Sequence, residues 1–383
     1  MQYHIVYLAI IIILIIIIVF ISAKFVKFAN IRKTIRSIIL KDPDCRSSLP
    51  RKNGTNLRPY DSHSLLLPRT FEQYKTEMDN LIQKAYDLED FGEKSQLADA
   101  CKKALNGGKR LRSIILLEVA RATSLTCLPT QKSTSISQGQ TSTGVDAAEA
   151  ALFIEYIHSA SIIVDDLPSF DNDLIRRGNP SLHADVGPAV AQMAALTLLA
   201  AAFQNICRQL DWIRDNCPEI QNVDRIGTRI CNDVSRSLGA FGAAGGQYMD
   251  ISKSETLIAE HGANAVADLM YRKTATFFEI SVITGWLVAG GNADQLNIMR
   301  DIGCHIGTAF QIADDVSDMK SDALRSTQGK PGWNYANMYG KDKAISEVER
   351  NLTSAKKLLK QTNLWTILWE DELFPKIKSM MNL

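Results

Sequence analysis

Two groups of aspartates each follow a long apolar stretch and bring several carboxylates together. The first group, in SIIVDDLPSFDNDLIRRG (161–178), comprises Asp165, Asp166, Asp171 and Asp173. The second group, in FQIADDVSD (310–318), comprises Asp314, Asp315 and Asp318. Carboxylates this close repel one another by roughly 4 kcal/mol per pair at an effective dielectric of 20, so burying them requires cations. Hard oxygen ligands of this kind suit Mg²⁺, and the pattern predicts a magnesium site.

The spacing within each group predicts how the carboxylates are presented. Asp314 and Asp318 are i and i+4, so on a helix both lie on one face and can share a ligand. Asp171 follows Asp165 at i+6, which on a straight helix places it about 240° away. Pro168 lacks an N–H and its ring clashes with the preceding turn, so the helix should break and bring Asp171 back toward Asp165. The two groups can then face each other across a cavity.

Two other interpretations of these acidic groups remain open. One is a solvated acidic turn, which would account for either group alone but less well for two, each at the end of an apolar helix. The other is a calcium loop, although DLPSFDND lacks the D-x-D-x-D-G order and the closing glutamate of an EF-hand.

Two basic motifs complement the aspartates. In LNGGKRLR (105–112), Lys109 and Arg112 are expected on one helix face, directly after two glycines. The start of a helix there adds free N–H groups and the positive end of a dipole. Arg176 and Arg177 are adjacent, so on a helix they diverge by about 100° and reach different anions. This divergence predicts two phosphate groups.

Two further positions carry polar groups inside apolar helical stretches. Lys273 and Thr274 lie in YRKTATFFE, and His158 precedes Asp165 by seven residues, nearly in line with it. Taken singly, Lys109 or Lys273 would be a surface lysine and His158 a hydrogen-bonded core histidine. In combination with the aspartates they indicate an anion-binding site.

The bulk composition excludes several classes of protein. The chain has 383 residues, 46% hydrophobic and 22% charged, enough to bury a large core. Its formal net charge of +1 provides no bulk field for nucleic acid, so we expect no nucleic-acid partner. The 7 cysteines are widely spaced and contain no C-x-x-C pair, which favours reduced thiols over a zinc site or a disulfide framework.

The N-terminal region predicts a membrane anchor. Residues 5–23 are uncharged and nearly all apolar, and at 1.5 Å per residue they span roughly 28 Å. Basic residues follow this stretch rather than precede it, which places the C-terminal bulk in the cytosol. The alternative is a cleaved signal peptide, which needs a basic n-region and a shorter apolar stretch. We therefore expect a transmembrane anchor at 1–23 and a basic juxtamembrane linker at 24–69.

The rest of the chain has helical periodicity. Apolar residues recur at i, i+3 and i+4 in six long stretches that begin near residues 70, 111, 145, 189, 265 and 296. The stretches at 145–164 and 189–206 are apolar almost all round, as in the middle of a large bundle. A Ser/Thr/Gln-rich insertion at 125–144 shows no periodicity and is expected to be mobile. The predicted class is all-α, with one domain at 70–383.

Taken in order, the motifs resemble those of the trans-isoprenyl diphosphate synthases. GGKRLR, the DDLPSFDNDLIRRG run, GGQYMD (245–250), the Lys-Thr pair and FQIADDVSD occur in the family's order over roughly 70–355. The membrane-anchored layout, with NICRQLDWI and GWNYANMYG, is similar to viral members of the family. The resemblance implies the isoprenoid synthase fold, a homodimer, and a host endoplasmic reticulum or virion membrane.

The resemblance also implies an activity: condensation of isopentenyl diphosphate with an allylic diphosphate, with two or three Mg²⁺ per active site. The metal ligands would be Asp165, Asp166, Asp171, Asp314, Asp315 and Asp318, and the catalytic set would be Asp165, Asp166, Asp171, Lys273, Asp314 and Asp315. The allylic diphosphate would be bound by Arg176, Lys273, Thr274 and Gln311. Isopentenyl diphosphate would be bound by Lys109, Arg112, His158 and Arg177.

Product length in this family depends on the residues one turn before the first aspartates. Here Ala160 and Ser161 are both small, whereas a bulky aromatic residue closes the tube at fifteen carbons in the family. The resemblance therefore implies a longer product, geranylgeranyl diphosphate, made from farnesyl diphosphate.

Some positions depart from the family pattern. Ala195-Leu196 stand where many members have Gly-Asp, and Ser113 stands where proline is usual; both are interpreted as packing changes. The family places two lysines after the second acidic group, and Lys330 is the best candidate here. Two alternatives share the fold: a class I terpene cyclase, which would not need a second diphosphate site, and a non-catalytic synthase-like subunit, which usually lacks one acidic motif.

Overall fold

The computed structural model describes residues 66–128, 144–252, 264–327 and 333–381. The chain divides into two compact units, Met1–Lys52 and Asn53–Leu383, and all described residues belong to the second. The predicted anchor at 1–23, most of the linker at 24–69, most of the insertion at 125–144, and Lys330 lie outside the described residues.

The described part is helical, which confirms the predicted all-α class. Its α-helices are α3 (Phe71–Asp87), α4 (Gln96–Leu105), α5 (Leu111–Cys127), α6 (Ala148–Asp166), α7 (Leu182–Val186), α8 (Pro188–Asn216), α9 (Val223–Leu238), α10 (Ala243–Ile251), α12 (Ala265–Met270), α13 (Thr276–Val288), α14 (Leu296–Thr327), α15 (Tyr335–Tyr339), α16 (Lys341–Gln361) and α17 (Phe374–Ser379). A 3₁₀ turn, η4 (Ala293–Gln295), and two π-helical turns, η3 (Tyr271–Ala275) and η5 (Trp369–Leu373), join some of them.

Local chemistry explains several helix boundaries. Thr70 caps α3 through a reciprocal capping box with Gln73, which satisfies two otherwise free N–H groups. Pro188 occupies the first position of α8, where its missing N–H costs no helical bond. Helix α6 ends at Asp166 because Leu167, which precedes Pro168, takes an extended conformation with ψ 152°.

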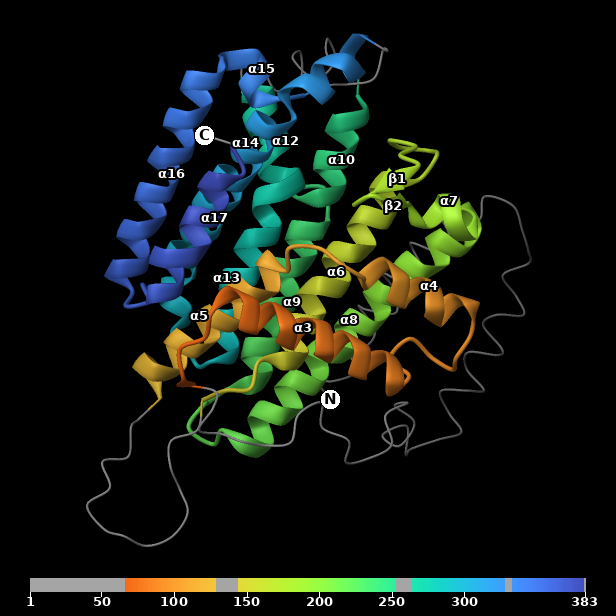
Figure 1. Cartoon of the computed structure of the whole chain (residues 1–383). Helices are drawn as coiled ribbons and strands as arrows, with labels where there is room; N and C mark the ends of the chain where they lie inside the picture. Colours follow the sequence, from red (N-terminus) through yellow and green to blue (C-terminus); the bar gives the residue numbers. More distant parts are fainter. Residues whose placement is uncertain (1–65, 129–143, 253–263, 328–332, 382–383) are drawn as a thin grey trace, which may run out of the picture. The chain divides into compact units, whose positions relative to one another are not determined.

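Three helices form the centre of the bundle. Every residue of α13 is buried. Every residue of α5 from Ser113 to Ser124 is buried as well, and α6 is buried along most of its length. Helix α13 packs against α5, α14 and α9, and α6 packs against α8 and α5. In Figure 1, α16 and α17 (blue) flank α14 on one side, while α3 and α4 (orange) lie over α6. This arrangement encloses one large apolar core, and Met249, Ala265 and Leu269 form a small second cluster.

Helix α8 has the length and composition of a membrane span. Its most apolar window has a mean hydropathy of 1.5, and 44% of that window is buried. It packs along α6 and also contacts α4, α7 and α9. These contacts are those of a bundle helix; Met193 is 42% exposed, while Val190, Leu199 and Phe203 are partly buried against the core.

The structure differs from the predicted helices in two places. Ile175–Arg176 (β1) and Asn179–Pro180 (β2) form a small antiparallel hairpin, so the two adjacent arginines lie at its turn and not on a helix. The predicted helix from Ala265 to Ala289 is interrupted by the π-helical turn η3. Both departures lie beside the acidic motifs.

Candidate active site at the carboxyl end of α6

The first acidic motif folds back on itself as the proline predicts. Helix α6 stops at Asp166, and the N–H of Asp171 donates to the carbonyl of Asp165 at 3.1 Å. The predicted return of Asp171 toward Asp165 is thereby confirmed. The two carboxylates lie on the same side of the turn and can serve one ligand.

A third carboxylate, from α10, completes this cluster. One ligand oxygen from each of Asp165, Asp171 and Asp250 lies within 4.8 Å of the other two. Asp250 belongs to the GGQYMD motif, to which the sequence interpretation assigned no role. Three oxygen donors at this separation fit a hard divalent cation such as Mg²⁺. We call Asp165, Asp171 and Asp250 the acidic triad.

Lys273 lies against the acidic triad. Its Nζ donates to Asp250 Oδ2 at 2.5 Å and to Asp165 Oδ1 at 3.0 Å. Burial opposes the charged ammonium, but Asp250 and Asp165 outweigh it and hold the pKa of Lys273 above its ordinary value. The lysine therefore stays charged and neutralises part of the triad.

The π-helical turn and a glycine together place Lys273. A π turn contains one more residue per hydrogen-bonded ring than an α-helix, and such turns are frequent at functional sites. Lys273 is the middle residue of η3, and α10 packs against this turn. A Cβ on Gly246 of α10 would lie 2.6 Å from the backbone nitrogen of Lys273. Only glycine permits this approach, which brings Asp250 to the lysine.

Thr274, the next residue of η3, connects to the second acidic motif. Its hydroxyl donates to Gln311 Oε1 at 2.6 Å, and Gln311 Nε2 donates to Asp315 Oδ1 at 2.8 Å. The backbone N–H of Tyr335 donates to Asp315 Oδ2, also at 2.8 Å. Burial raises the pKa of Asp315 to about 7. Thus η3 connects the two acidic motifs: Lys273 contacts Asp165 of the first motif, and Thr274 contacts Gln311 of the second.

Asp314 and Asp318 present their carboxylates more openly than Asp315. The Asp314 side chain is 42% exposed and lies 4.0 Å from Lys109 Nζ, and Asp318 is exposed. Burial and the charge of Asp318 raise the pKa of Asp314. Within the described ranges, the acidic triad is the one group of at least three acids close enough to share an ion, and Asp314 is not part of it.

Asp166 is engaged by Arg176. The arginine donates from Nε to Oδ1 at 2.9 Å and to Oδ2 at 3.2 Å, and Nη2 also donates to Oδ1. Asp173 accepts from the same Nη2 at 3.5 Å. Asp166 is 3% exposed, and its burial raises the pKa of its carboxyl group against the opposing effect of Arg176.

A second cationic site is built around Arg112 and His158. Arg112 Nη1 lies 3.2 Å from His158 Nε2, and the guanidinium lies 4.6 Å from the ring of Phe278. The rings of Phe277 and Phe310 are both 5.7 Å away. Burial lowers the pKa of Arg112 to about 10 and, with the neighbouring arginines, lowers the pKa of His158 well below its ordinary value. His158 is therefore neutral.

Two nitrogens at this site lack a partner among the described residues. They are Arg112 Nε and His158 Nδ1, and both are buried. Because the guanidinium can only donate, neutral His158 accepts at Nε2 and carries its proton on Nδ1. Two buried, unpartnered donors beside a cation fit an anionic ligand such as a diphosphate.

Lys109 and Arg177 reach this site from outside a helix. Helix α5 begins at Leu111, so the prediction that Lys109 and Arg112 share one helix face is wrong. Lys109 precedes the helix, and its Nζ lies 5.5 Å from the centre of the Phe310 ring. Arg177 extends from the hairpin and donates to the carbonyl of Asn106 at 3.4 Å. A Cβ on Gly108 would lie 2.8 Å from Arg177 Nη1, so this guanidinium rests on a glycine.

The two adjacent arginines diverge, but for a different reason from the one predicted. Arg176 ends strand β1, whereas Arg177 begins the turn with a left-handed φ of 54°, so Arg176 reaches Asp166 while Arg177 reaches Asn106. The two residues predicted to set product length lie on α6: Ala160 is 1% exposed, and the Ser161 hydroxyl donates to the His158 carbonyl at 2.8 Å. Their role, like that of Lys330, stays a prediction.

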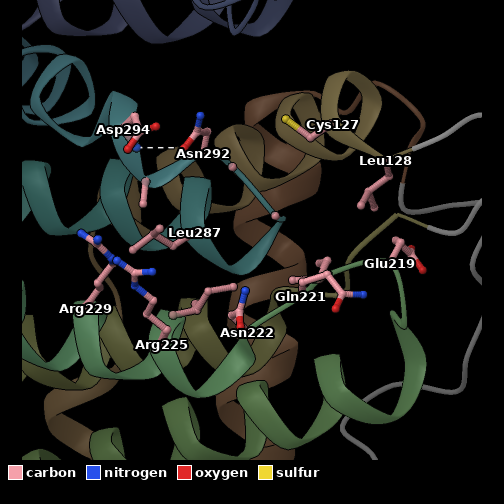
Figure 2. Close-up of a pocket in the computed structure, with 15 residues that line it drawn as sticks. Cys127, Leu128, Glu219, Gln221, Asn222, Arg225, Arg229, Leu287, Asn292 and Asp294 are labelled. Carbon is pink, nitrogen blue, oxygen red and sulfur yellow. Dashed lines mark hydrogen bonds between the residues drawn. The ribbon is translucent and has the colours of Figure 1, made fainter.

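A separate pocket of about 450 Å³ lies at the other end of α5, between that helix, α9 and α13 (Figure 2). Its wall includes Cys127, Arg225, Arg229 and Leu287. Helix α5 runs from the Arg112 site to this pocket over 17 residues, or roughly 24 Å at 1.5 Å per residue. The acidic triad and the Arg112 site are therefore distinct from it.

Solved structures share this fold. A geranyltransferase from Legionella pneumophila superposes with a TM-score of 0.63 at 22% identity, covering 82% of this chain and 97% of that one. A geranyltranstransferase from Thermotoga maritima gives a TM-score of 0.58 at 22% identity, over 82% and 98% of the two chains. At these identities the similarity confirms the predicted isoprenoid synthase fold.

Sequence similarity goes further. A trans-prenyltransferase of African swine fever virus is 36% identical over 312 residues, covering 82% of this chain and 84% of the relative. The large subunit 1 of the heterodimeric geranylgeranyl pyrophosphate synthase of Arabidopsis thaliana is 30% identical over 298 residues, covering 77% and 70%. The family profile described as polyprenyl synthetase matches residues 94–339, a span that contains both acidic motifs, η3 and the Arg112 site, and the chain belongs to this family.

Proposed function

We propose that the protein is a trans-prenyltransferase that condenses isopentenyl diphosphate with farnesyl diphosphate to give geranylgeranyl diphosphate. The observation that carries this proposal is the presence of two separate sites that suit a diphosphate. One is the acidic triad with Lys273, which would bind a diphosphate through Mg²⁺, and the other is the Arg112–His158 pair with its two unpartnered donors, which would bind one directly. A reaction that joins two diphosphate substrates needs both.

The allylic substrate occupies the site between the two acidic motifs. Asp165, Asp171 and Asp250, together with Asp314 and Asp318 of the second motif, would hold Mg²⁺ for the diphosphate. Mg²⁺, when bound there, supplies Lewis-acid stabilisation of the negative charge on the departing diphosphate. The predicted participation of Asp166 and Asp315 as further ligands is untested.

Protein donors hold the same diphosphate. Lys273 and Arg176 are charged and border the triad, while Thr274 and Gln311 form the adjoining hydrogen-bonded pair. These groups stabilise charge as the allylic C–O bond breaks and its electron pair leaves with the diphosphate. No side chain acts as a nucleophile.

Isopentenyl diphosphate occupies the Arg112 site. Arg112 Nε and His158 Nδ1 donate to its diphosphate. Lys109, just before α5, and Arg177, in the hairpin turn, add positive charge. The double bond of this substrate attacks the allylic carbon, and a proton then leaves the neighbouring carbon, with the departed diphosphate as its acceptor. Phe277, Phe278 and Phe310 surround Arg112 with their rings. These rings exclude water that would otherwise react with the allylic carbocation.

The growing chain extends along α6. Ala160 and Ser161 lie one turn before Asp165, and neither presents a bulky side chain. This supports a product longer than fifteen carbons, and the names of the Arabidopsis relative and of other plant relatives agree with a twenty-carbon product.

Membrane attachment and dimerisation complete the proposal. The apolar stretch at 5–23 anchors the chain in a host endoplasmic reticulum or virion membrane, with the catalytic domain on the cytosolic side. The proposed homodimer would use α8, whose most apolar window is 44% buried, as the helix that meets a second copy of the chain.

Product sizing tests the proposal. The full-length protein in detergent is incubated with Mg²⁺, radiolabelled isopentenyl diphosphate and dimethylallyl, geranyl or farnesyl diphosphate in turn, and products are sized after dephosphorylation. We expect a twenty-carbon alcohol, most rapidly from farnesyl diphosphate. Cyclised hydrocarbon would favour a terpene cyclase, and no elongation with any starter would support a non-catalytic subunit.

A further inference from the structure

Arg110, the middle basic residue of GGKRLR, has its side chain buried between helices. The side chain is 3% exposed, whereas that of its neighbour Lys109 is 54% exposed. Nε and Nη2 both lie 2.9 Å from Asp79 Oδ1 of α3, and Nη1 donates to Glu155 Oε2 of α6 at 3.1 Å. Nη2 also donates to the Leu105 carbonyl at the end of α4. Each nitrogen of this guanidinium therefore has a partner within the protein, so Arg110 is not a candidate to touch a substrate.

The backbone of Arg110 is in the left-handed region, with φ 53° and ψ 19°, directly before α5 begins at Leu111. Residues that carry a Cβ seldom adopt this conformation, and it persists where the surrounding structure holds it in place. No side chain caps α5 at this residue. The contacts of the Arg110 side chain with α3, α4 and α6 therefore fix the point at which the chain enters α5.

A single carboxylate of α6 binds the residues on both sides of Arg112. Glu155 is buried, and its Oε2 accepts from Arg110 while its Oε1 accepts from Ser113 Oγ at 2.8 Å. Arg112 lies between these two residues in the sequence. Glu155 also precedes His158 by three residues, so the two side chains lie on one face of α6. The start of α5 is thereby held at a fixed place relative to His158.

Ser113 contributes a hydrogen bond that the sequence interpretation did not assign to it. Its position is one where proline is usual in the family, and the difference was interpreted as a packing change. The hydroxyl donates to Glu155 Oε1, and its oxygen also lies 3.0 Å from the Arg110 carbonyl. Neither proline nor alanine offers such a donor. In this chain the serine therefore adds a second contact between α5 and Glu155.

We propose that Arg110 is a positioning residue for isopentenyl diphosphate, and that Glu155 and Ser113 complete the support. The support sets the start of α5 so that Arg112 Nη1 and His158 Nε2 lie 3.2 Å apart. In this arrangement the two buried donors, Arg112 Nε and His158 Nδ1, can serve one ligand. The inference rests on the proposed function, since it assigns the Arg112 site to isopentenyl diphosphate.

The substitution Arg110→Lys tests the proposal, and Arg121→Lys is its matched control. Lysine keeps the positive charge, but one ammonium cannot serve Asp79, Glu155 and the Leu105 carbonyl together. Arg121 is also a buried arginine of α5 that contacts a glutamate and a backbone carbonyl: it donates to Glu118 at 2.9 and 2.6 Å and to the Leu66 carbonyl at 3.2 Å. It follows Arg110 by 11 positions, or roughly 16 Å along the helix.

The KM values of the two substrates separate positioning from a loss of stability. In the full-length protein, Arg110→Lys should raise the KM for isopentenyl diphosphate about tenfold, equivalent to weakening one charge-assisted hydrogen bond. The KM for farnesyl diphosphate should stay within about twofold. Arg121→Lys should lower the melting temperature by a similar amount and leave both KM values within about twofold. The proposal is overturned by an unchanged KM for isopentenyl diphosphate in Arg110→Lys, by an equal rise for both substrates, or by the same rise in Arg121→Lys.

Ser113→Ala is a milder variant that tests the same support if Arg110→Lys does not fold. It removes one of the two donors to Glu155 and should raise the KM for isopentenyl diphosphate about two- to fivefold, with that for farnesyl diphosphate unchanged. Ser124→Ala is the matched control, because Ser124 is a buried serine of α5 whose Oγ accepts from the N–H of Val145 at 3.2 Å. Equal KM values in Ser113→Ala and Ser124→Ala would reject the role of Glu155.

Failure of the proposed function is recognised separately. If the wild-type protein elongates no starter, the function is wrong, but the anion site can still be compared among the variants. Binding of inorganic diphosphate in the presence of EDTA is then measured by calorimetry. Weaker binding in Arg110→Lys and Ser113→Ala than in their controls would support the positioning role, and equal binding in all four variants would reject it.

Discussion

Replacing Arg112 by lysine should make the use of isopentenyl diphosphate dependent on pH. Burial lowers the pKa of Arg112 to about 10, with Glu155 and Asp314 opposing the effect. An ordinary lysine has a pKa of about 10.4, roughly 2 below that of arginine, so the same burial would place a lysine there near about 8. The lysine would be charged below this pH and neutral above it.

The magnitude follows from the charged fraction. For a pKa near 8, about nine-tenths of the lysine is charged at pH 7 and about one-tenth at pH 9. If only the charged form binds the diphosphate, kcat/KM for isopentenyl diphosphate should fall about tenfold between these values. Loss of the contact with the Phe278 face should add a constant decrease of several-fold, since cation–π contacts contribute about 0.5–2 kcal/mol.

The assay compares kcat/KM for isopentenyl diphosphate at pH 7, 8 and 9 in Arg112→Lys and the wild type. Dividing one profile by the other removes the titration of the substrate, which is common to both. Arg225→Lys, at the exposed start of α9, is the matched control and should follow the wild type. A flat ratio for Arg112→Lys would show that the site is not desolvated enough to shift a lysine, and would refute the reasoning.

Three further outcomes are expected. Ala160→Phe should shorten the principal product, because Ala160 is buried one turn before Asp165; an unchanged chain length on product sizing would refute this account of the tube. Gly108→Ala should raise the KM for isopentenyl diphosphate, since its Cβ would meet the Arg177 guanidinium at 2.8 Å; Gly92→Ala, at a similar φ of 86° with no neighbour within 4 Å, should cost stability without that effect. Lys273→Met should destabilise the metal-free protein by about 1–3 kcal/mol in thermal denaturation, because Asp165 and Asp250 lose their shared cation; added Mg²⁺ should restore part of the loss, and equal melting temperatures with EDTA would contradict the role of the lysine.

Periodicity was sufficient for the helices but not for the elements between them. The apolar repeats near residues 70, 145 and 189 predicted α3, α6 and α8, because each of these helices buries apolar residues that recur at helical spacing. Strands of two residues are too short for any alternation to be seen, so the hairpin at Ile175–Pro180 left no periodic signal. The π-helical turn η3 continues from α12 into α13 without a proline or glycine, so nothing in the sequence marked it within the predicted helix.

The site was predicted in part for similar reasons. Pro168 was sufficient to predict the return of Asp171, because the effect of a proline is local. Asp250 was missed since it is a single acid among small residues, and its approach to Asp165 depends on the packing of α10 against η3. The different orientations of Asp165, which meets Lys273, and Asp166, which meets Arg176, could have been foreseen from the 100° between neighbouring helical residues.

The extra residue of η3 makes the length of this segment as constrained as its composition. Deleting a single codon within 271–275 would close the wide turn into a regular α-helix and change the directions in which the side chains of the turn point by up to about 100°. Lys273 and Thr274 could then no longer reach Asp165 and Gln311 together, although no side chain of the site had been altered. Insertions and deletions here are therefore expected to be as damaging as replacement of the lysine itself, which exposed loops would not be.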